Sequence, residues 1–219
     1  MANENSDRSP VNRLEQSKAS SYTLKLATRK LAWQWLGANV LGFAIATPLS
    51  FITTLYIAGL IVGATVGPLQ ALVLQSQLPR LRLWQWVLAN IVGSYVGAWA
   101  GFLMLSMILA MLPLFNAPSL ENMSVVLIST ALYGAIIGMI VGIAQIFSFP
   151  AQAQNIAQWW TANLMGRTLG WLSASLLGWG IFAVTKADNF LMIWGPLLGA
   201  AGGAVYALAT TKALLKLKG

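Results

Sequence analysis

The stretch Gly59-Leu-Ile-Val-Gly63-Ala-Thr-Val-Gly67-Pro-Leu-Gln70 decides the fold class of this chain. Its three glycines stand four residues apart in an uncharged apolar run, and such positions form one row on a helix. In water this would be a poor helix, because each glycine costs about 1 kcal/mol relative to alanine. In a bilayer the same row lets the backbone of another helix approach closely. The stretch therefore predicts a transmembrane helix that packs through its glycines.

Rows of small residues recur along the chain. Two rows repeat the spacing of Gly59, Gly63 and Gly67: Gly134, Gly138 and Gly142 before Gln145, and Gly195, Gly199 and Gly203 before Tyr206. Two more rows lie between them, one of three glycines at Gly93, Gly97 and Gly101 and one of two at Gly166 and Gly170. We expect all of these glycines to be helix-packing positions.

The composition predicts an integral membrane protein, most of whose surface is surrounded by lipid. The chain is 58% hydrophobic and only 8% charged, with a mean hydropathy of +0.70, whereas a soluble domain carries about 25% charged residues. Cysteine and histidine are both absent. That absence excludes disulfides, thiol nucleophiles, and metal or haem sites that depend on these side chains.

The apolar runs predict an all-α fold with six transmembrane helices, at about 31–49, 52–76, 84–112, 124–148, 159–184 and 190–211. Pro48 and Ser50 are expected to mark the first turn. Residues 1–30 are predicted to be a polar, basic, partly disordered tail, and residues 212–219 a basic C-terminus. A cleavable signal ending near Ala46 is rejected, because this segment recurs later as a structural unit.

The basic residues predict the orientation of the chain. The net charge is +8, and 13 residues are Lys or Arg. All but Lys186 and Arg167 lie in the N-terminal tail, in the loop of Arg80 and Arg82, or at the C-terminus. The positive-inside rule then places both termini in the cytoplasm. We expect a bacterial inner membrane or an internal photosynthetic membrane, and no binding to nucleic acid.

The odd-numbered spans carry a common motif, which indicates an internal repeat. Each has Gln-Trp, then Asn four residues after that Trp, then Gly three residues later, in the segments 34–42, 85–93 and 158–166. Each is followed by a span with a glycine row. The pattern predicts three parallel αα-hairpin repeats about an axis along the membrane normal.

The tryptophans of these motifs fall at the inner ends of the outgoing helices. They are Trp33, Trp35, Trp84, Trp86, Trp159 and Trp160. An aromatic belt at the headgroup level explains this placement, because indole rings favour that depth. Stacking against a pigment or another ligand is the alternative.

Buried amides form the candidate site. Asn39, Gln70, Asn90, Gln145 and Asn163 are expected at one depth in the inner half of the bilayer, with Arg167 one helical turn beyond Asn163. One reading is structural, with amides bonded across helices and Arg167 snorkelling to the headgroups. The other is a binding site for an anionic or carbonyl-bearing ligand, since a charge within a span is often functional.

The spans lack the residues that catalysis and ion coupling require. None contains Asp or Glu, which argues against a proton- or sodium-coupled pump. No carboxylate pair, nucleophile with a base, or nucleotide-binding loop is present. We therefore expect no enzymatic activity, no metal and no cofactor, with an associated pigment or quinone as a weaker alternative.

Two motifs carry a family resemblance. The run from Gly67-Pro-Leu-Gln70 to Leu78-Pro79-Arg80 and the pattern Trp-x-x-x-Asn-x-x-Gly resemble a group of uncharacterised polytopic membrane proteins common in photosynthetic bacteria. The resemblance covers about residues 31 to 170. It implies a membrane location and no assigned activity.

These observations lead to two functional hypotheses. The first is a non-enzymatic accessory, scaffold or assembly component of a membrane complex, with a membrane-protein partner or a second copy of the chain. It rests on the many packing rows and the lack of chemistry. The alternative is a transporter or binding subunit for a small solute or a lipid-type ligand, with its site at the pseudo-threefold axis.

Overall fold

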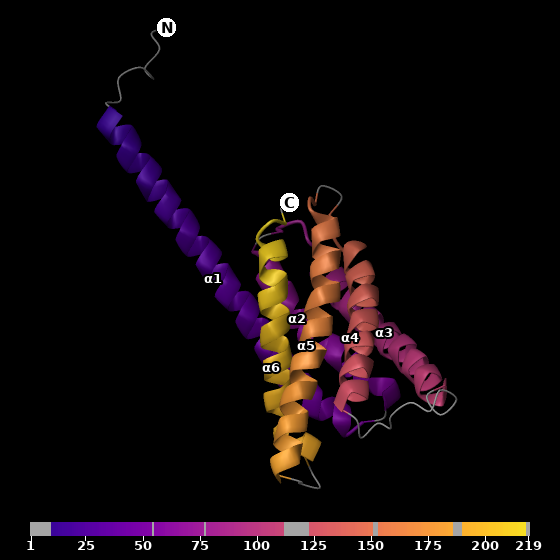
Figure 1. The fold of residues 1–219 in the computed structure, drawn as a ribbon. Coiled ribbons are helices and arrows are strands. Elements are labelled where there is room, and N and C mark those ends of the chain that lie inside the picture. Colours follow the sequence, from indigo (N-terminus) through magenta and orange to yellow (C-terminus); the bar gives the residue numbers. More distant parts are fainter. Residues whose placement is uncertain are drawn as a thin grey trace.

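The computed structural model describes residues 10–53, 55–76, 78–111, 123–150, 153–185 and 190–217. It is all-α, and these residues form six helices (Figure 1). They are α1 (Pro10–Phe51), α2 (Leu55–Gln75), α3 (Leu83–Met111), α4 (Met123–Ile146), α5 (Ile156–Thr185) and α6 (Phe190–Leu214).

The helices form a closed ring. Each packs against its neighbours in the sequence, and α6 packs against α1 to complete the circle (Figure 1). Across the described residues, helices on opposite sides of the ring do not come into backbone contact. The centre of the bundle is therefore occupied by side chains and by space rather than by a central helix.

Five of the six helices, α2 to α6, are long and apolar enough to cross a membrane. The sequence predicts six spans, and α1 is the exception because Gln34, Asn39 and two Trp residues lower the hydropathy of its apolar part. Large apolar side chains cover the outside of the bundle. Leu72, Met107 and Leu208, for example, are each more than 60% exposed, as expected where the surroundings are lipid.

The first helix begins and ends differently from the prediction. Residues 1–9 of the expected tail lie outside the described residues, whereas residues 10–30 form the first half of α1 and project from the bundle (Figure 1). Pro10 stands at the first helical position, where a missing N–H costs nothing. The chain has no glycine before Gly37 to interrupt the helix.

The expected turn at Pro48 and Ser50 lies inside α1, which continues to Phe51. The Ser50 hydroxyl donates to the Ala46 carbonyl at 2.8 Å, and the Ile52 amide donates to the Pro48 carbonyl at 3.3 Å. These bonds carry the helix past the proline, which cannot donate a backbone bond of its own.

The glycine rows of α2, α4 and α6 face the backbone of the next helix around the ring. A Cβ atom would lie 2.5 Å from the Ser94 carbonyl oxygen at Gly59, 2.7 Å from that of Asn163 at Gly138, and 2.6 Å from that of Asn39 at Gly203. The other glycines of these rows lie at the same three contacts, α2 on α3, α4 on α5 and α6 on α1: Gly63, Gly67, Gly134, Gly142, Gly195 and Gly199.

The rows of α3 and α5 face the helix that follows each of them. On α3, Gly93 and Gly97 lie against the Cα atoms of Val141 and Ile137, and Gly101 lies against the Tyr133 ring. On α5, Gly166 and Gly170 lie against α6. All five interfaces that carry these rows are therefore internal to the ring.

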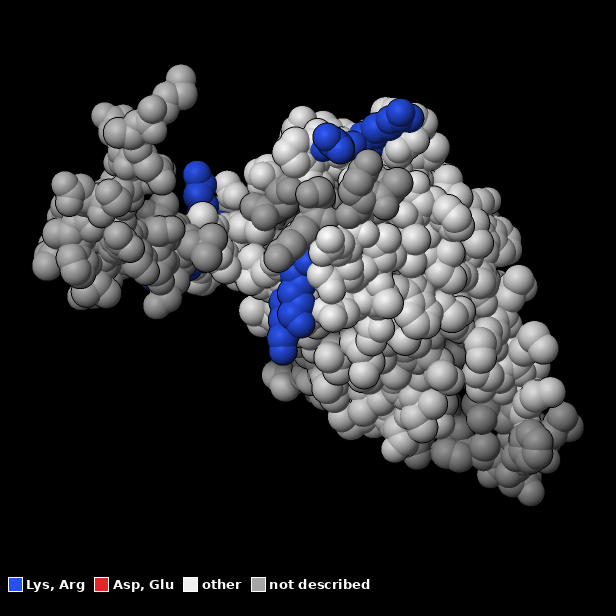
Figure 2. All heavy atoms as spheres, turned by 90° about the horizontal axis from the view of Figure 1, so that it is seen from above, with Lys and Arg blue, Asp and Glu red and all other residues white. Residues whose placement is uncertain are grey.

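The two ends of the bundle differ in charge. The start of α1 and the end of α6 lie at one end (Figure 1), which we call the basic end after its exposed residues Arg29, Lys30, Arg80, Arg82, Lys212 and Lys216. Seen from above in Figure 2, this face shows blue side chains and no red ones. At the opposite end, the described residues include no Lys, Arg, Asp or Glu.

Candidate functional site

A layer of hydrogen-bonded side chains crosses the interior of the ring. Asn39, Asn90 and Asn163 are all fully buried, and each accepts a bond at Oδ1 from the helix that follows its own. The donors are Gln70 Nε2 at 2.7 Å, Gln145 Nε2 at 3.0 Å and the Tyr206 hydroxyl at 2.8 Å. We call these six residues the amide layer. Tyr206 occupies in α6 the place that glutamine occupies in α2 and α4, three residues after the last glycine of the row.

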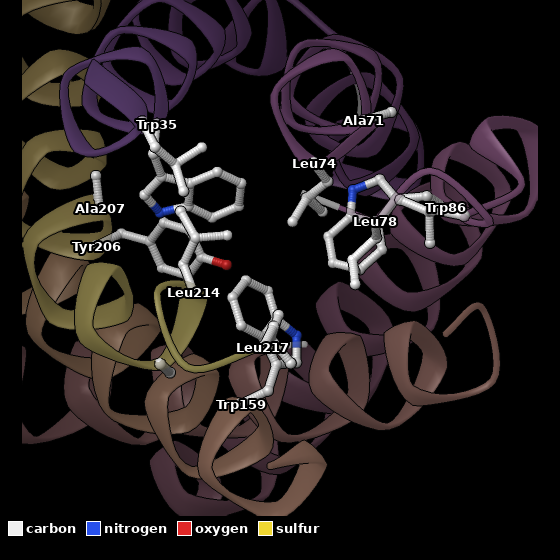
Figure 3. Packing of buried hydrophobic residues seen from close by; sticks show 13 residues of the cluster. Trp35, Ala71, Leu74, Leu78, Trp86, Trp159, Tyr206, Ala207, Leu214 and Leu217 are labelled. Carbon is white, nitrogen blue, oxygen red and sulfur yellow. The ribbon is translucent and has the colours of Figure 1, made fainter. Parts of the chain in front are cut away.

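A layer of tryptophans lies next to the amide layer, toward the basic end. Each asparagine donates through Nδ2 to the carbonyl four residues earlier, that of Trp35 at 2.8 Å, Trp86 at 2.9 Å or Trp159 at 3.4 Å. Residues four apart share a helix face, so the three indoles also point into the ring (Figure 3). The ring centroids of Trp35 and Trp86 lie 5.7 and 5.8 Å from that of Trp159.

These positions correct the expectation of an aromatic belt. Trp35, Trp86 and Trp159 are fully buried, whereas Trp33 and Trp84 are about 60% exposed. The exposed pair is placed as a belt would be, and the sixth predicted tryptophan, Trp160, is half-buried and donates to the Met139 carbonyl at 3.3 Å. The signal that separates the two groups is present in the sequence, because each buried tryptophan stands four residues before an asparagine.

The indole N–H groups of this layer are bonded in two of three cases. Trp35 donates to Thr210 Oγ1 at 2.8 Å, and Trp159 donates to Gln145 Oε1 at 3.0 Å. The first bond joins α1 to α6, and the second joins α5 to α4. Trp86 Nε1 and Gln70 Oε1 are buried without a partner.

Leucines close the ring on the side of the tryptophans that faces the basic end. Leu78 and Leu81 from the segment after α2, and Leu214 and Leu217 from the end of α6, are at most 5% exposed and belong to the same core cluster (Figure 3). Asn155 Nδ2 donates to the Lys216 carbonyl at 2.8 Å, which attaches the C-terminal segment to the start of α5. The basic end of the ring is thus sealed by packed side chains.

The other side of the amide layer opens into a cavity of about 430 Å³. Side chains from all six helices line it. Its lining runs from the buried Ser94, Arg167 and Tyr206 to Phe51 and Phe182 near the opposite helix ends, which are about half exposed. Ligand pockets for small molecules have volumes of about 300 to 1,000 Å³ and mostly apolar walls. The cavity has the size and the lining of such a pocket.

Arg167 lies at the deep end of this cavity and does not snorkel. The residue is only 3% exposed. Its guanidinium carbon lies 4.8 Å from the centroid of the Phe43 ring and 5.0 Å from that of Tyr206, distances at which a cation is attracted by the ring face. Its Nε and Nη2 atoms are buried and have no hydrogen-bond partner.

Among the described residues that line the cavity, no carboxylate balances Arg167. The acidic residues of the sequence are Glu4, Asp7, Glu15, Glu121 and Asp188, and none of them is among the described lining residues. A buried charge is normally paired, because removing an ion from water costs several kcal/mol. This arginine is therefore the least compensated group in the described part of the bundle.

The structure divides the predicted site into two parts. The five amides bond within their layer and are not among the residues that line the cavity, whereas Arg167 is. Two lining residues went unnoticed as site residues, Ser94 and Tyr206. Ser94 and Phe43 stand four residues after Asn90 and Asn39, as Arg167 stands four after Asn163. Phe43, Ser94 and Arg167 thus occupy the same position relative to the asparagine of each motif.

Comparison with protein-family models, with curated proteins and with solved structures finds no match to this chain. Its described residues also include no cluster of His, Cys, Asp or Glu that could hold a metal ion. The cavity and the side chains around it are therefore the features of this chain that bear on its function.

Proposed function

We propose that this protein is a multi-pass membrane protein that binds a small molecule in the axial cavity and serves as a transporter or as the binding subunit of one. The observation that carries the proposal is the buried Arg167, which lines the cavity with two nitrogens unbonded and with no carboxylate among the described lining residues. A purely structural arginine would be expected to have a partner, since an unpaired charge in a span is costly. A ligand that supplies the missing acceptors accounts for it.

The proposal includes the finer architecture. We propose that α1 also crosses the membrane, because it completes the ring and packs against α2 and α6. Each of the three asparagines accepts a hydrogen bond from the helix that follows its own, and the glycine rows of α2, α4 and α6 each contact the next helix around the ring. Both patterns support three hairpin repeats around one axis. The concentration of basic residues at one end supports a cytoplasmic position for both termini. The cavity then faces away from the cytoplasm.

The packing rows give less support to a scaffold than they did in the sequence alone. That hypothesis relied on more glycine rows than an isolated bundle needs. Each row instead contacts a neighbouring helix of the same chain, so the rows are not free for a partner protein.

One observation still favours an accessory role as the second candidate. Residues 26–30 of α1 are all exposed, and the helix continues to Pro10 beyond the bundle (Figure 1). Tyr22 and Leu26 are 66% and 49% exposed. A partner that binds this projecting half of α1 would make the protein a subunit of a larger complex.

The test is mass spectrometry of the full chain purified from its native membrane in lipid nanodiscs. Ala174 lines the cavity, so Ala174→Phe would fill part of the space, whereas Leu169→Phe on the exposed side of α5 is the matched control. We expect a small molecule at near-stoichiometric amount in the wild type and in the control, and its loss in Ala174→Phe. Equal content in all three proteins, or no molecule with a stoichiometric partner protein, would contradict the proposal.

A further inference from the structure

The cavity combines one cation with apolar walls, and this combination specifies a chemical class. We infer that its ligand is a singly charged anionic amphiphile, whose acid group lies at Arg167 and Ser94 and whose apolar body extends toward Phe51 and Phe182. The inference rests on the proposed function and narrows it to one class of ligand.

The geometry of Arg167 favours an acid group. The rings of Phe43 and Tyr206 lie near its guanidinium. These rings attract the positive charge, but the N–H groups of Nε and Nη2 still lack hydrogen-bond acceptors. Nε and Nη2, the two unbonded nitrogens, form one edge of the guanidinium. A carboxylate or a similar acid can accept from both nitrogens of such an edge at once.

Ser94 supplies a second unused group in the same cavity. The residue is 2% exposed, and its Oγ has no hydrogen-bond partner. Other hydroxyls of the bundle, such as those of Thr65, Thr130 and Ser173, donate to a carbonyl three or four residues earlier. A buried hydroxyl left without a partner is unfavourable, and a ligand oxygen would satisfy it. Two buried polar groups that lack partners therefore line the same pocket.

The charge balance selects a single negative charge. Among the described residues that line the cavity, Arg167 is the only charged one. A monoanion would neutralise it, whereas a dianion would leave one negative charge uncompensated between apolar walls, where isolated charges are strongly disfavoured. A cation would meet repulsion, and a zwitterion would need a carboxylate that the lining lacks.

The shape of the cavity selects the apolar body. Beyond Arg167 its wall consists mainly of glycine, alanine, aliphatic and aromatic side chains, contributed for example by Ala98, Ile137, Trp171, Leu198 and Phe182. The volume of about 430 Å³ lies at the lower end of the range of about 300 to 1,000 Å³ that is typical of pockets for one small molecule. This space suits one alkyl chain or one ring system better than a lipid with two long chains.

The decisive experiment uses four probes that share a ten-carbon chain and carry different head groups. Decanoate, decanol, decyl phosphate and decyltrimethylammonium are titrated calorimetrically into the full chain in nanodiscs of uncharged lipid. We expect decanoate to bind at least about tenfold more tightly than decanol, the scale of one desolvated charge pair. Decyl phosphate and the cation should bind more weakly than decanoate.

Variants assign the preference to the two polar groups. Arg167→Gln should reduce the decanoate-to-decanol ratio to near one, and Arg167→Lys, which keeps the charge without the two-nitrogen edge, should restore part of it. Ser94→Ala should weaken decanoate several-fold, the effect of one lost hydrogen bond to an ion, and leave decanol unchanged. Arg80→Gln, at the exposed basic end, is the control and should change neither.

The outcomes separate this inference from the proposed function. Equal binding of decanoate and decanol, both abolished by Ala174→Phe, would overturn the anionic class while keeping a ligand site in the cavity. Binding unaffected by Ala174→Phe would overturn both, since the probes would then lie elsewhere. If nanodiscs with phosphatidylglycerol suppress decanoate binding, the acid group belongs to a membrane lipid; if they do not, it belongs to a free acid.

Discussion

At the scale of single residues, the interior is organised by asparagines that bond in two directions. Each donates along its own helix and accepts from the next one, so that neither atom of its amide is left over. Hydrogen bonds between transmembrane helices contribute modestly, about 0.6 to 2 kcal/mol each. Their larger effect is on specificity, because an asparagine turned toward lipid would lack any partner.

The Asn39–Gln70 pair allows this contribution to be measured. Asn39→Leu leaves the Gln70 amide without an acceptor and should cost about 1 to 3 kcal/mol of unfolding free energy. Gln70→Met should cost a similar amount, and the double variant should cost clearly less than the sum, because no buried donor remains unpaired. Unfolding titrations in mixed micelles give the four values. Strict additivity would show that the two side chains act independently, and Leu41→Ala on the exposed side of α1 is the control.

Much of this layer was predictable from residue types and spacing. The motif identified Asn39, Asn90 and Asn163 as equivalent, and the glutamines were expected at the same depth. The spacing alone could not show whether these amides form hydrogen bonds to one another or to a ligand. That choice depends on whether each amide meets a partner across a helix pair, which is a property of the packed ring. The inward turn of Trp35, Trp86 and Trp159 was missed, although their distance from the asparagines indicated it.

At the scale of elements, the glycine rows fix how closely the helices approach. A Cβ at Gly59 would lie 2.5 Å from a carbonyl of α3, well inside normal contact. The predicted glycine spacing located the rows but not the helices they face. The mean hydropathy of α1 is lowered by the exposed Gln34 and the buried Asn39, although the helix belongs to the ring.

Alanine substitutions distinguish a packed glycine from a free one. Gly63 faces the backbone of Asn90 and Ile91, whereas nothing lies within 4 Å of a Cβ at Gly37. Gly63→Ala should lose about 1 to 3 kcal/mol through overpacking, and Gly37→Ala should be neutral or gain up to about 1 kcal/mol from helix propensity. Thermal unfolding in detergent provides the comparison. Similar midpoints for both variants would mean that α2 and α3 are not held by this contact.

At the scale of the whole molecule, the ring is sealed at the basic end and hollow at the other. Tryptophans and leucines fill the sealed part, and the cavity begins beyond the amide layer. The sequence predicted the helices. It could not indicate whether the interior of the ring is filled, because the answer depends on how far apart opposite helices stand.

Cysteine labelling tests the orientation, and the absence of native cysteine makes single-cysteine variants simple to interpret. Ser76 follows α2 at the basic end, and Thr185 ends α5 at the other; both are exposed. We expect a membrane-impermeant maleimide to label Thr185→Cys in intact cells and Ser76→Cys only after permeabilisation. The reverse pattern would place the basic end outside and turn the cavity toward the cytoplasm.

The closure of the ring between α1 and α6 has a consequence for biosynthesis. Five of the six interfaces join consecutive helices and can form as each helix leaves the ribosome and enters the bilayer. The sixth joins the first helix made to the last, so it waits for the entire chain. Until then the backbone of α1 around Asn39 and Phe43, which the α6 glycines later cover, remains uncovered. The lipid around it offers no contact that replaces α6. A chain truncated before α6 would thus present an open seam, and that seam is the surface by which a membrane quality-control protease can recognise an unfinished product.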